Sequence, residues 1–191
     1  EGDIKNTFEG ENRVSNIIAY TSPTVSGFSG TVAMIPGEGA DVDGDGIDDT
    51  GLTDGMSYSL SYSKDNLYLA LASDKDVDSQ DLVRMVMQYK IDNLKLGAMF
   101  QQNEDNQGTK DESGYFVSAA YKIDKTTLKA QYGFIEDDVD GDEEETLSLG
   151  ADYKLSKNTK AYIFYTDNTD SEVDSSDDED SSFGVGMEHK F

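Results

Sequence analysis

The sequence predicts an all-β protein: a transmembrane antiparallel β-barrel wall with about eleven strands, in one domain over residues 1–191. A repeat supports this, because Tyr89–Ile91 returns 32 residues later as Tyr121–Ile123, again as Tyr153–Leu155, and in altered form as His189–Phe191. Each copy closes a stretch of about ten residues in which apolar and polar side chains alternate, as in strands with one apolar face. About 9–11 residues is the length that a tilted strand needs to cross a bilayer.

Strands are expected wherever alternating runs are bounded by turn residues. In order they are 12–22, 28–36, 55–64, 66–74, 81–91, 94–103, 113–123, 127–135, 145–155, 158–167 and 182–191. Short turns alternate with five long acidic segments, which are 36–54, 74–81, 103–113, 136–145 and 167–180. Tight turns on one rim and long loops on the other are typical of outer-membrane barrels.

The two faces of the expected strands differ in chemistry. In 81–91, Met85 and Met87 share one side with other apolar residues, whereas Arg84 and Gln88 share the other. A face with Lys, Arg, Gln and Ser on strand after strand makes a poor packed core, because lone buried charges cost several kcal/mol. We therefore expect it to line water. Aromatic residues that close alternate strands predict a girdle at the periplasmic rim: Tyr20, Tyr62, Tyr89, Tyr121, Tyr153 and Phe191.

Composition excludes several classes of function. The net charge of -25 disfavours nucleic acid as a partner, since phosphate binding needs the opposite sign. The absence of Cys removes disulfides and thiolate metal sites. No apolar run approaches 18 residues, so a helical membrane span is excluded. The start of the chain has neither Met nor a secretory signal, and we expect a mature product or a fragment.

Three features resemble the general porin family of Gram-negative bacteria. They are the run Arg13–Tyr20 leading through Pro23 into Val25–Gly30, the ending Gly184–Phe191, and the count of eleven strands with five long loops. The resemblance implies the last eleven strands of a sixteen-stranded barrel, with residues 1–11 as the exit of its constriction loop. An odd number of antiparallel strands cannot close a barrel with both chain ends on one rim. Either N-terminal strands are absent from this sequence, or residues 2–9 add a twelfth strand to a smaller barrel.

Candidate site residues follow from the strand phase and from the resemblance. By resemblance, Arg13 corresponds to the basic ladder that faces the constriction loop; the alternative is an ordinary surface arginine. The residues expected to line the pore are Arg13, Arg84, Lys95, Lys129 and Lys160, and those at the periplasmic mouth are Lys90, Lys122, Lys154 and Lys190. The resemblance also implies that the terminal Phe191 is the signal that the outer-membrane assembly machinery reads.

The function expected is passive diffusion of small hydrophilic solutes and ions through the outer membrane of a Gram-negative bacterium. Outer-membrane lipid and lipopolysaccharide are the expected surroundings, and the resemblance implies a homotrimer. Two alternatives stay open: a non-channel barrel that binds ligands at the cell surface, and a soluble calcium-binding β-protein. We expect no enzyme, because His189 is the only histidine and lies beside the terminus at an interfacial position.

One acidic segment has the spacing of a calcium loop. Asp41, Asp43, Asp45 and Asp49 alternate with other residues around glycines, which lets a tight loop turn several oxygens onto one ion. The bidentate Glu of an EF-hand is missing, with Leu52 in its place. Calcium at these four aspartates and a simple solvated acidic loop are therefore both open, and no other cofactor is expected.

Overall fold

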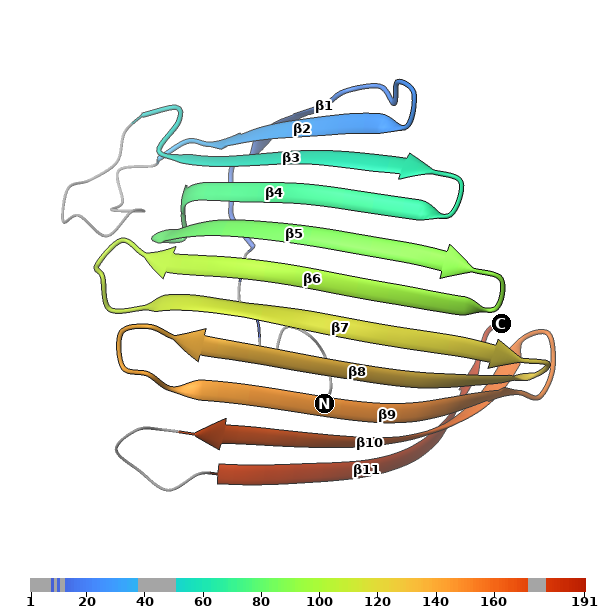
Figure 1. Cartoon of the computed structure of the whole chain (residues 1–191). Helices are drawn as coiled ribbons and strands as arrows, with labels where there is room; N and C mark the ends of the chain where they lie inside the picture. The colour runs from blue at the N-terminus through green and yellow to red at the C-terminus, as the bar shows by residue number, and fades with distance from the viewer. Residues whose placement is uncertain (1–7, 9, 11–12, 38–50, 172–177) are drawn as a thin grey trace.

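The computed structural model describes residues 8, 10, 13–37, 51–171 and 178–191. Its eleven strands form one antiparallel sheet in which each strand pairs with its neighbours in the chain, from β1 to β11 (Figure 1). They are β1 Ile18–Thr21, β2 Phe28–Ile35, β3 Gly55–Lys64, β4 Leu67–Val77, β5 Gln80–Ile91, β6 Leu94–Asp105, β7 Asp111–Ile123, β8 Thr126–Asp137, β9 Glu143–Lys154, β10 Thr159–Ser171 and β11 Asp178–His189. The predicted all-β fold with eleven antiparallel strands is confirmed. The sheet is open, with β1 and β11 at its edges.

The sheet has two rims. The short-turn rim carries the connections 22–27, 65–66, 92–93, 124–125 and 155–158, and the acidic rim carries 78–79, 106–110 and 138–142. The ends of β2, β3, β10 and β11 that the remaining connections join also lie at the acidic rim. The described part of the chain contains no helix that is long and apolar enough to span a membrane.

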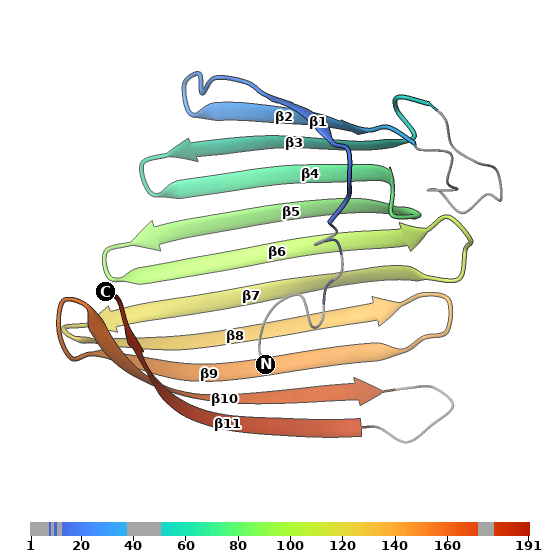
Figure 2. The same ribbon diagram turned by 180° about the vertical axis from the view of Figure 1, so that it is seen from behind.

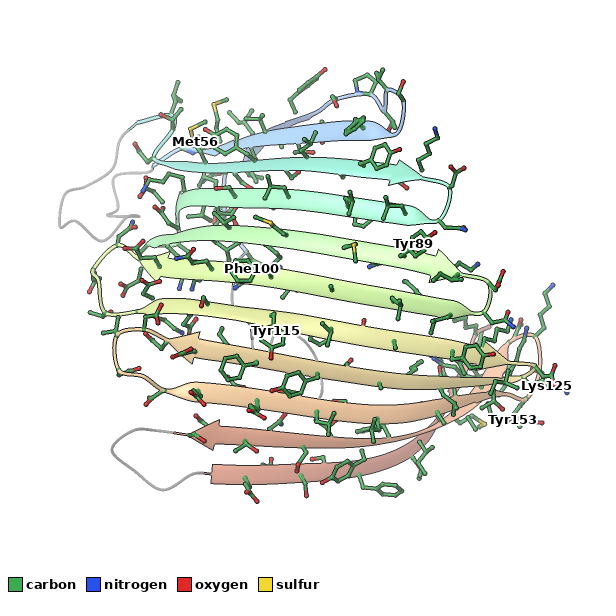
Figure 3. All side chains as sticks on the ribbon, viewed as in Figure 1. Met56, Tyr89, Phe100, Tyr115, Lys125 and Tyr153 are labelled. Carbon is green, nitrogen blue, oxygen red and sulfur yellow. The ribbon has the colours of Figure 1, made fainter. Side chains whose placement is uncertain are left out.

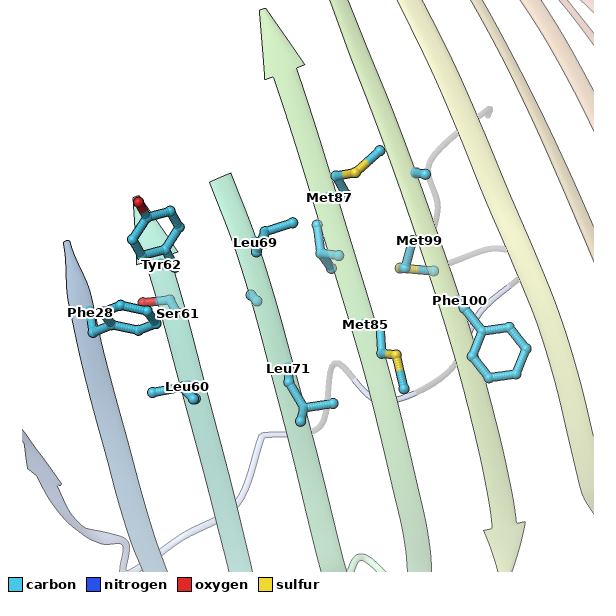
Figure 4. A pocket seen from close by; sticks show the side chains of 13 residues that line it. Phe28, Leu60, Ser61, Tyr62, Leu69, Leu71, Met85, Met87, Met99 and Phe100 are labelled. Carbon is cyan, nitrogen blue, oxygen red and sulfur yellow. The ribbon is translucent and has the colours of Figure 1, made fainter. Parts of the chain in front are cut away.

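One face of the sheet, the outer face, is apolar and exposed. Leu71, Met85 and Phe100 lie opposite one another across β4, β5 and β6, and each is about half exposed. Along β5, the apolar residues from Val83 to Ile91 cover about 27 Å of strand, close to the ~25 Å apolar band of outer-membrane barrels. A shallow hollow of about 540 Å³ between β2 and β6 interrupts this face (Figure 4). Soluble proteins rarely expose so large an apolar surface, so this face needs a cover.

The 32-residue repeat has a structural basis at the short-turn rim. In each copy the backbone N–H of the lysine donates a hydrogen bond to a carbonyl of the preceding short turn. The pairs and their N···O distances are Lys90–Asn66 (3.0 Å), Lys122–Asn93 (2.9 Å), Lys154–Lys125 (2.8 Å) and Lys190–Asn158 (2.9 Å). Each repeat is thus one pair of antiparallel strands. The strand that runs toward the short-turn rim ends with a hydrogen bond to the preceding short turn. In the first three copies the tyrosine before the lysine faces outward, and Tyr89 and Tyr153 lie toward this rim (Figure 3).

Two sequence predictions about strand length are wrong. The first strand begins at Ile18 rather than at residue 12, because Asn16 takes a left-handed φ of 56° that interrupts an extended chain. At the acidic rim the strands run further than expected, and three of the five long loops shrink to 78–79, 106–110 and 138–142. Antiparallel pairing uses only backbone groups, so acidic side chains in water do not end it. Between β4 and β5, Asp81 Oδ1 accepts the Asp76 N–H at 2.9 Å and stabilises the tight turn.

The short-turn ends of β10 and β11 curl out of the plane of the sheet (Figures 1 and 2). Gly184 and Gly186 of β11 lie opposite Phe164 and Tyr162 of β10. A Cβ on either glycine would collide with the aromatic ring facing it. The rings therefore cover the glycine backbone, and this close approach accompanies the bend.

Candidate functional site: the inner face and the segment that crosses it

The described residues of the segment that precedes β1 are 8, 10 and 13–17, and we call them the crossing segment. Phe8 and Gly10 of this segment lie over the face opposite the apolar one, the inner face, which Figure 2 shows from behind. Phe8 is the anchor, with only 2% of its surface exposed. Its ring packs against an apolar patch on the inner face, the Phe8 socket, formed by Val86, Met99, Phe116 and Ile135. Val86, Met99 and Phe116 lie side by side on β5, β6 and β7, so strand pairing assembles the socket from three separate strands.

Two glycines let the Phe8 ring approach the sheet. A Cβ on Gly114 would lie 2.9 Å from Phe8 Cε1, and one on Gly133 would lie 3.5 Å from Phe8 Cε2. A side chain at Gly114 would also collide with the backbone carbonyl of Phe134. The socket is therefore a shallow depression in a polar wall, made by small residues below the ring and apolar residues around it.

Next to the socket, the crossing segment lies over a basic residue. Gly10 has a left-handed φ of 96°, and a Cβ there would collide with Leu82 and lie 3.3 Å from Arg84 Nη2. Arg84 Nε donates a hydrogen bond of 2.7 Å to Gln101 Oε1, and Gln101 is 1% exposed. Gly10 is thus required both for its φ and for the space. Gly10 and the Arg84 guanidinium therefore lie beside each other on the inner face.

Hydroxyl and amide groups continue the polar surface across β8, β9 and β10. Ser148 hydroxyl lies 2.9 Å from the Thr166 hydroxyl and 3.5 Å from Gln131 Nε2. Further toward the acidic rim, Thr146 Oγ1 donates to Asn168 Oδ1 at 2.9 Å. These side chains satisfy one another laterally, so the wall presents a hydrogen-bonded polar surface rather than isolated buried groups.

Toward the short-turn rim, charged side chains form a row across β8 to β11, the ion ladder. Lys129 Nζ lies 2.7 Å from Asp152 Oδ2, and Lys160 Nζ lies 3.5 Å from the same oxygen. Lys160 Nζ is also 3.0 Å from Glu188 Oε2, and Lys190 Nζ is 3.6 Å from Glu188 Oε1. Three cations thus alternate with two carboxylates. Because all five side chains are exposed to solvent in part, water and salt screen these contacts, and each contributes little to stability.

The predicted pore residues on strands all lie on the inner face. Arg84 lies beside Gly10, Lys129 and Lys160 belong to the ion ladder, and Lys95 is exposed and paired across from Lys90. Arg13 is exposed and precedes β1, so the prediction that it begins a strand is wrong. The roles of these residues stay predictions.

The other predicted site residues divide between described and undescribed parts of the chain. The residues predicted at the periplasmic mouth all lie at the short-turn rim: Lys90, Lys122, Lys154 and Lys190. The terminal Phe191 is exposed, with its ring centroid 4.9 Å from that of His189. The candidate calcium ligands lie outside the described residues: Asp41, Asp43, Asp45 and Asp49. Within the described ranges, no group of three or more His, Cys, Asp or Glu side chains is arranged to hold a metal ion.

Sequence reasoning missed the Phe8 socket and the carboxylates of the ion ladder. A signal for the socket was present, because Val86 and Ile135 interrupt the otherwise polar faces of their strands. Asp152 and Glu188 also follow the polar phase of β9 and β11. What the alternation lacked was register, which decides that Lys129 meets Asp152 diagonally across the pair β8–β9.

Comparisons with known proteins agree with this geometry. The family model for Gram-negative porins matches residues 2–174. No match was found among curated protein sequences. The anion-selective porin from Comamonas acidovorans is similar in structure, with a TM-score of 0.79 and 17% identity over 93% of this chain and 60% of that one. The outer membrane channel DcaP of Acinetobacter baumannii has a TM-score of 0.72 and 12% identity, over 92% and 62%.

OmpT, an outer membrane protein of Vibrio cholerae, has a TM-score of 0.64 and 15% identity, over 91% of this chain and 64% of that one. The chain therefore spans less than two thirds of the length of these structures. Identities this low carry the fold alone, whereas the family model covers most of the chain. The suspected family is thus confirmed: the chain belongs to the Gram-negative porin family.

Proposed function

We propose that this chain forms part of the wall of a water-filled channel in the outer membrane, through which small hydrophilic solutes and ions diffuse passively. The observation that carries the proposal is the contrast between the two faces of one sheet. The outer face bears exposed apolar side chains from β2 to β11. The inner face bears the Arg84–Gln101 pair, the hydroxyl row and the ion ladder. A bilayer covers the first, and water solvates the second.

The crossing segment gives the channel its narrow part. Phe8 fastens the segment in its socket, and Gly10 brings its backbone against Arg84. A backbone segment held near a guanidinium leaves a polar passage between the segment and the free part of the inner face. The lateral position of Arg84 would let it attract anions at that point, while the acidic rim concentrates cations in front of it.

The wider setting also belongs to the proposal. Membership in the porin family favours a channel rather than an enzyme, and we infer that the chain is no enzyme. Outer-membrane lipid and lipopolysaccharide would cover the apolar face, with a homotrimer as the assembly and further strands closing the barrel. The exposed ring of Phe191 at the chain end supports recognition by the assembly machinery.

Planar-bilayer recording with the full-length protein tests the channel. Steady conductance that rises linearly with voltage and with salt concentration is the expected result, since a water-filled passage has no gate that requires energy. Reconstituted protein that is folded yet leaves the bilayer silent would contradict the proposal. Calcium titration of the same preparation by calorimetry would then test the surface-binding alternative, which requires a saturable heat from the acidic loops.

A further inference from the structure

A polar cavity lies at the short-turn ends of β8 to β11. Its volume is about 250 Å³, which is smaller than the ~300–1,000 Å³ of sites for drug-sized ligands. It is bounded by the turn 155–158 and by the curled end of β11, and Lys125 is labelled at this rim in Figure 3. We call it the rim cavity. Its charged lining residues are Lys125, Lys154, Lys157, Lys160, Lys190, Asp152 and Glu188.

The charges of the rim cavity do not balance. Five lysines face two carboxylates, in a protein whose net charge is -25. Both carboxylates are already engaged in the ion ladder with Lys129, Lys160 and Lys190. Among the described residues, Lys125, Lys154 and Lys157 have no carboxylate oxygen within 4.0 Å. The charged lining thus has a surplus of three positive charges. Lysines that share one small cavity with too few carboxylates repel one another unless an anion enters.

The neutral part of the lining is ordered by hydrogen bonds. The backbone N–H groups of Leu155 and Ser156 donate to the Thr159 carbonyl at 3.0 and 3.1 Å. Ser156 Oγ donates to Thr159 Oγ1 at 3.0 Å, and that oxygen lies 2.8 Å from His189 Nδ1. The turn between β9 and β10 is thereby tied to the end of β11. The cavity is consequently built on a connected frame and not on loose side chains alone.

We propose that the rim cavity binds a phosphate group. Its cations are all lysines, with no arginine fork to match a flat carboxylate. Lysines act as point charges, and three of them around one tetrahedral, doubly charged group can each donate to a different oxygen. A small phosphorylated solute and a lipid headgroup both present this group, and the experiment below distinguishes them. The proposal does not depend on conduction, since binding requires only the folded rim.

Isothermal titration calorimetry with inorganic phosphate, on the full chain folded in a neutral detergent at low ionic strength, tests the site. The wild-type protein is expected to give a saturable heat that weakens with added salt. The triple variant K125Q/K154Q/K157Q should lose it, and the single variant K157Q should bind about fivefold more weakly. The matched control K64Q/K75Q/K110Q removes the same charge far from the cavity and should bind as the wild type does.

The outcomes separate the possibilities. Saturable binding that survives in the triple variant, or that falls equally in the control, would overturn the proposal. Dihexanoyl phosphatidic acid forms a second arm: if it binds in a lysine-dependent way and inorganic phosphate does not, the source is a lipid headgroup. If neither probe gives a saturable heat with folded wild-type protein, no phosphate site exists. Channel conductance is measured separately, and its outcome does not depend on whether phosphate binds.

Discussion

At the scale of single residues, Phe8 decides where the crossing segment lies. It is the one described side chain of that segment that is buried in the sheet, in a socket built by β5 to β8. Removal of a buried phenyl ring costs roughly 3 kcal/mol or more in a protein core. We therefore expect this ring to contribute strongly to the position of the segment.

We therefore predict that Phe8→Ala frees the crossing segment. Single-channel recordings should show larger and noisier currents, and limited proteolysis should cut the segment sooner. Phe100→Ala is the matched control, because it removes the same ring from the outer face. Equal protease sensitivity of the Phe8 variant and the wild-type protein would show that the socket does not hold the segment.

Asp152 is the second residue with a disproportionate role, because its carboxylate contacts two lysines of the ion ladder. We predict that Asp152→Asn leaves Lys129 with no carboxylate contact. The channel should then become more permeable to anions and less permeable to cations. The reversal potential in a potassium chloride gradient should move in the direction of anion selectivity, while stability changes by less than about 1 kcal/mol. Asp65→Asn, in a short turn away from these lysines, is the control and should leave the potential unchanged.

At the scale of elements, the edge strand β11 depends on its glycines. We predict that Gly186→Ala lowers stability by about 1–3 kcal/mol, because its Cβ would push the Tyr162 ring out of place. Urea unfolding of the detergent-folded protein measures this. Gly30→Ala in β2 is the matched control, since its Cβ would meet nothing nearer than the Ser59 carbonyl at 3.5 Å. Equal midpoints for both variants would exclude the ring contact as a determinant of the bend.

Element boundaries also show where local pattern stops being informative. The range 55–64 predicted for β3 is correct, because an alternating run ends at Asp65, which takes a left-handed φ of 51°. The range 12–22 for the first strand is wrong, although its residues have strand-like composition. There Asn16 takes a left-handed φ of 56°, and pairing with β2 begins only at Ile18. Alternation of apolar and polar residues cannot distinguish a strand that pairs in the sheet from a segment that lies over the sheet, because the pattern does not specify hydrogen-bond partners.

At the scale of the whole molecule, the two faces meet different solvents, and adjacent residues of one strand can test this. We predict that Met87→Lys, on the outer face, costs about 2–4 kcal/mol near the bilayer centre. Gln88→Lys, on the inner face, should be tolerated. Both variants are folded into lipid vesicles and run on a gel with and without heating. The folded fraction is measured from the band whose electrophoretic mobility changes on heating. Equal loss of folding for the two variants would contradict the assignment of faces.

The sequence by itself determined the number and order of the strands, the division into an apolar and a polar face, the two rims and the family, but not all of the strand ends. These features follow from a period of two and from turn residues, which are local properties of the chain. Only the tertiary structure decided that Phe8 is buried in the wall, that Lys129, Asp152 and Lys160 belong to one ion ladder, and that five lysines line the rim cavity. Such contacts join residues far apart in the chain, and their distances depend on strand register and sheet curvature, which the pattern of one strand does not contain.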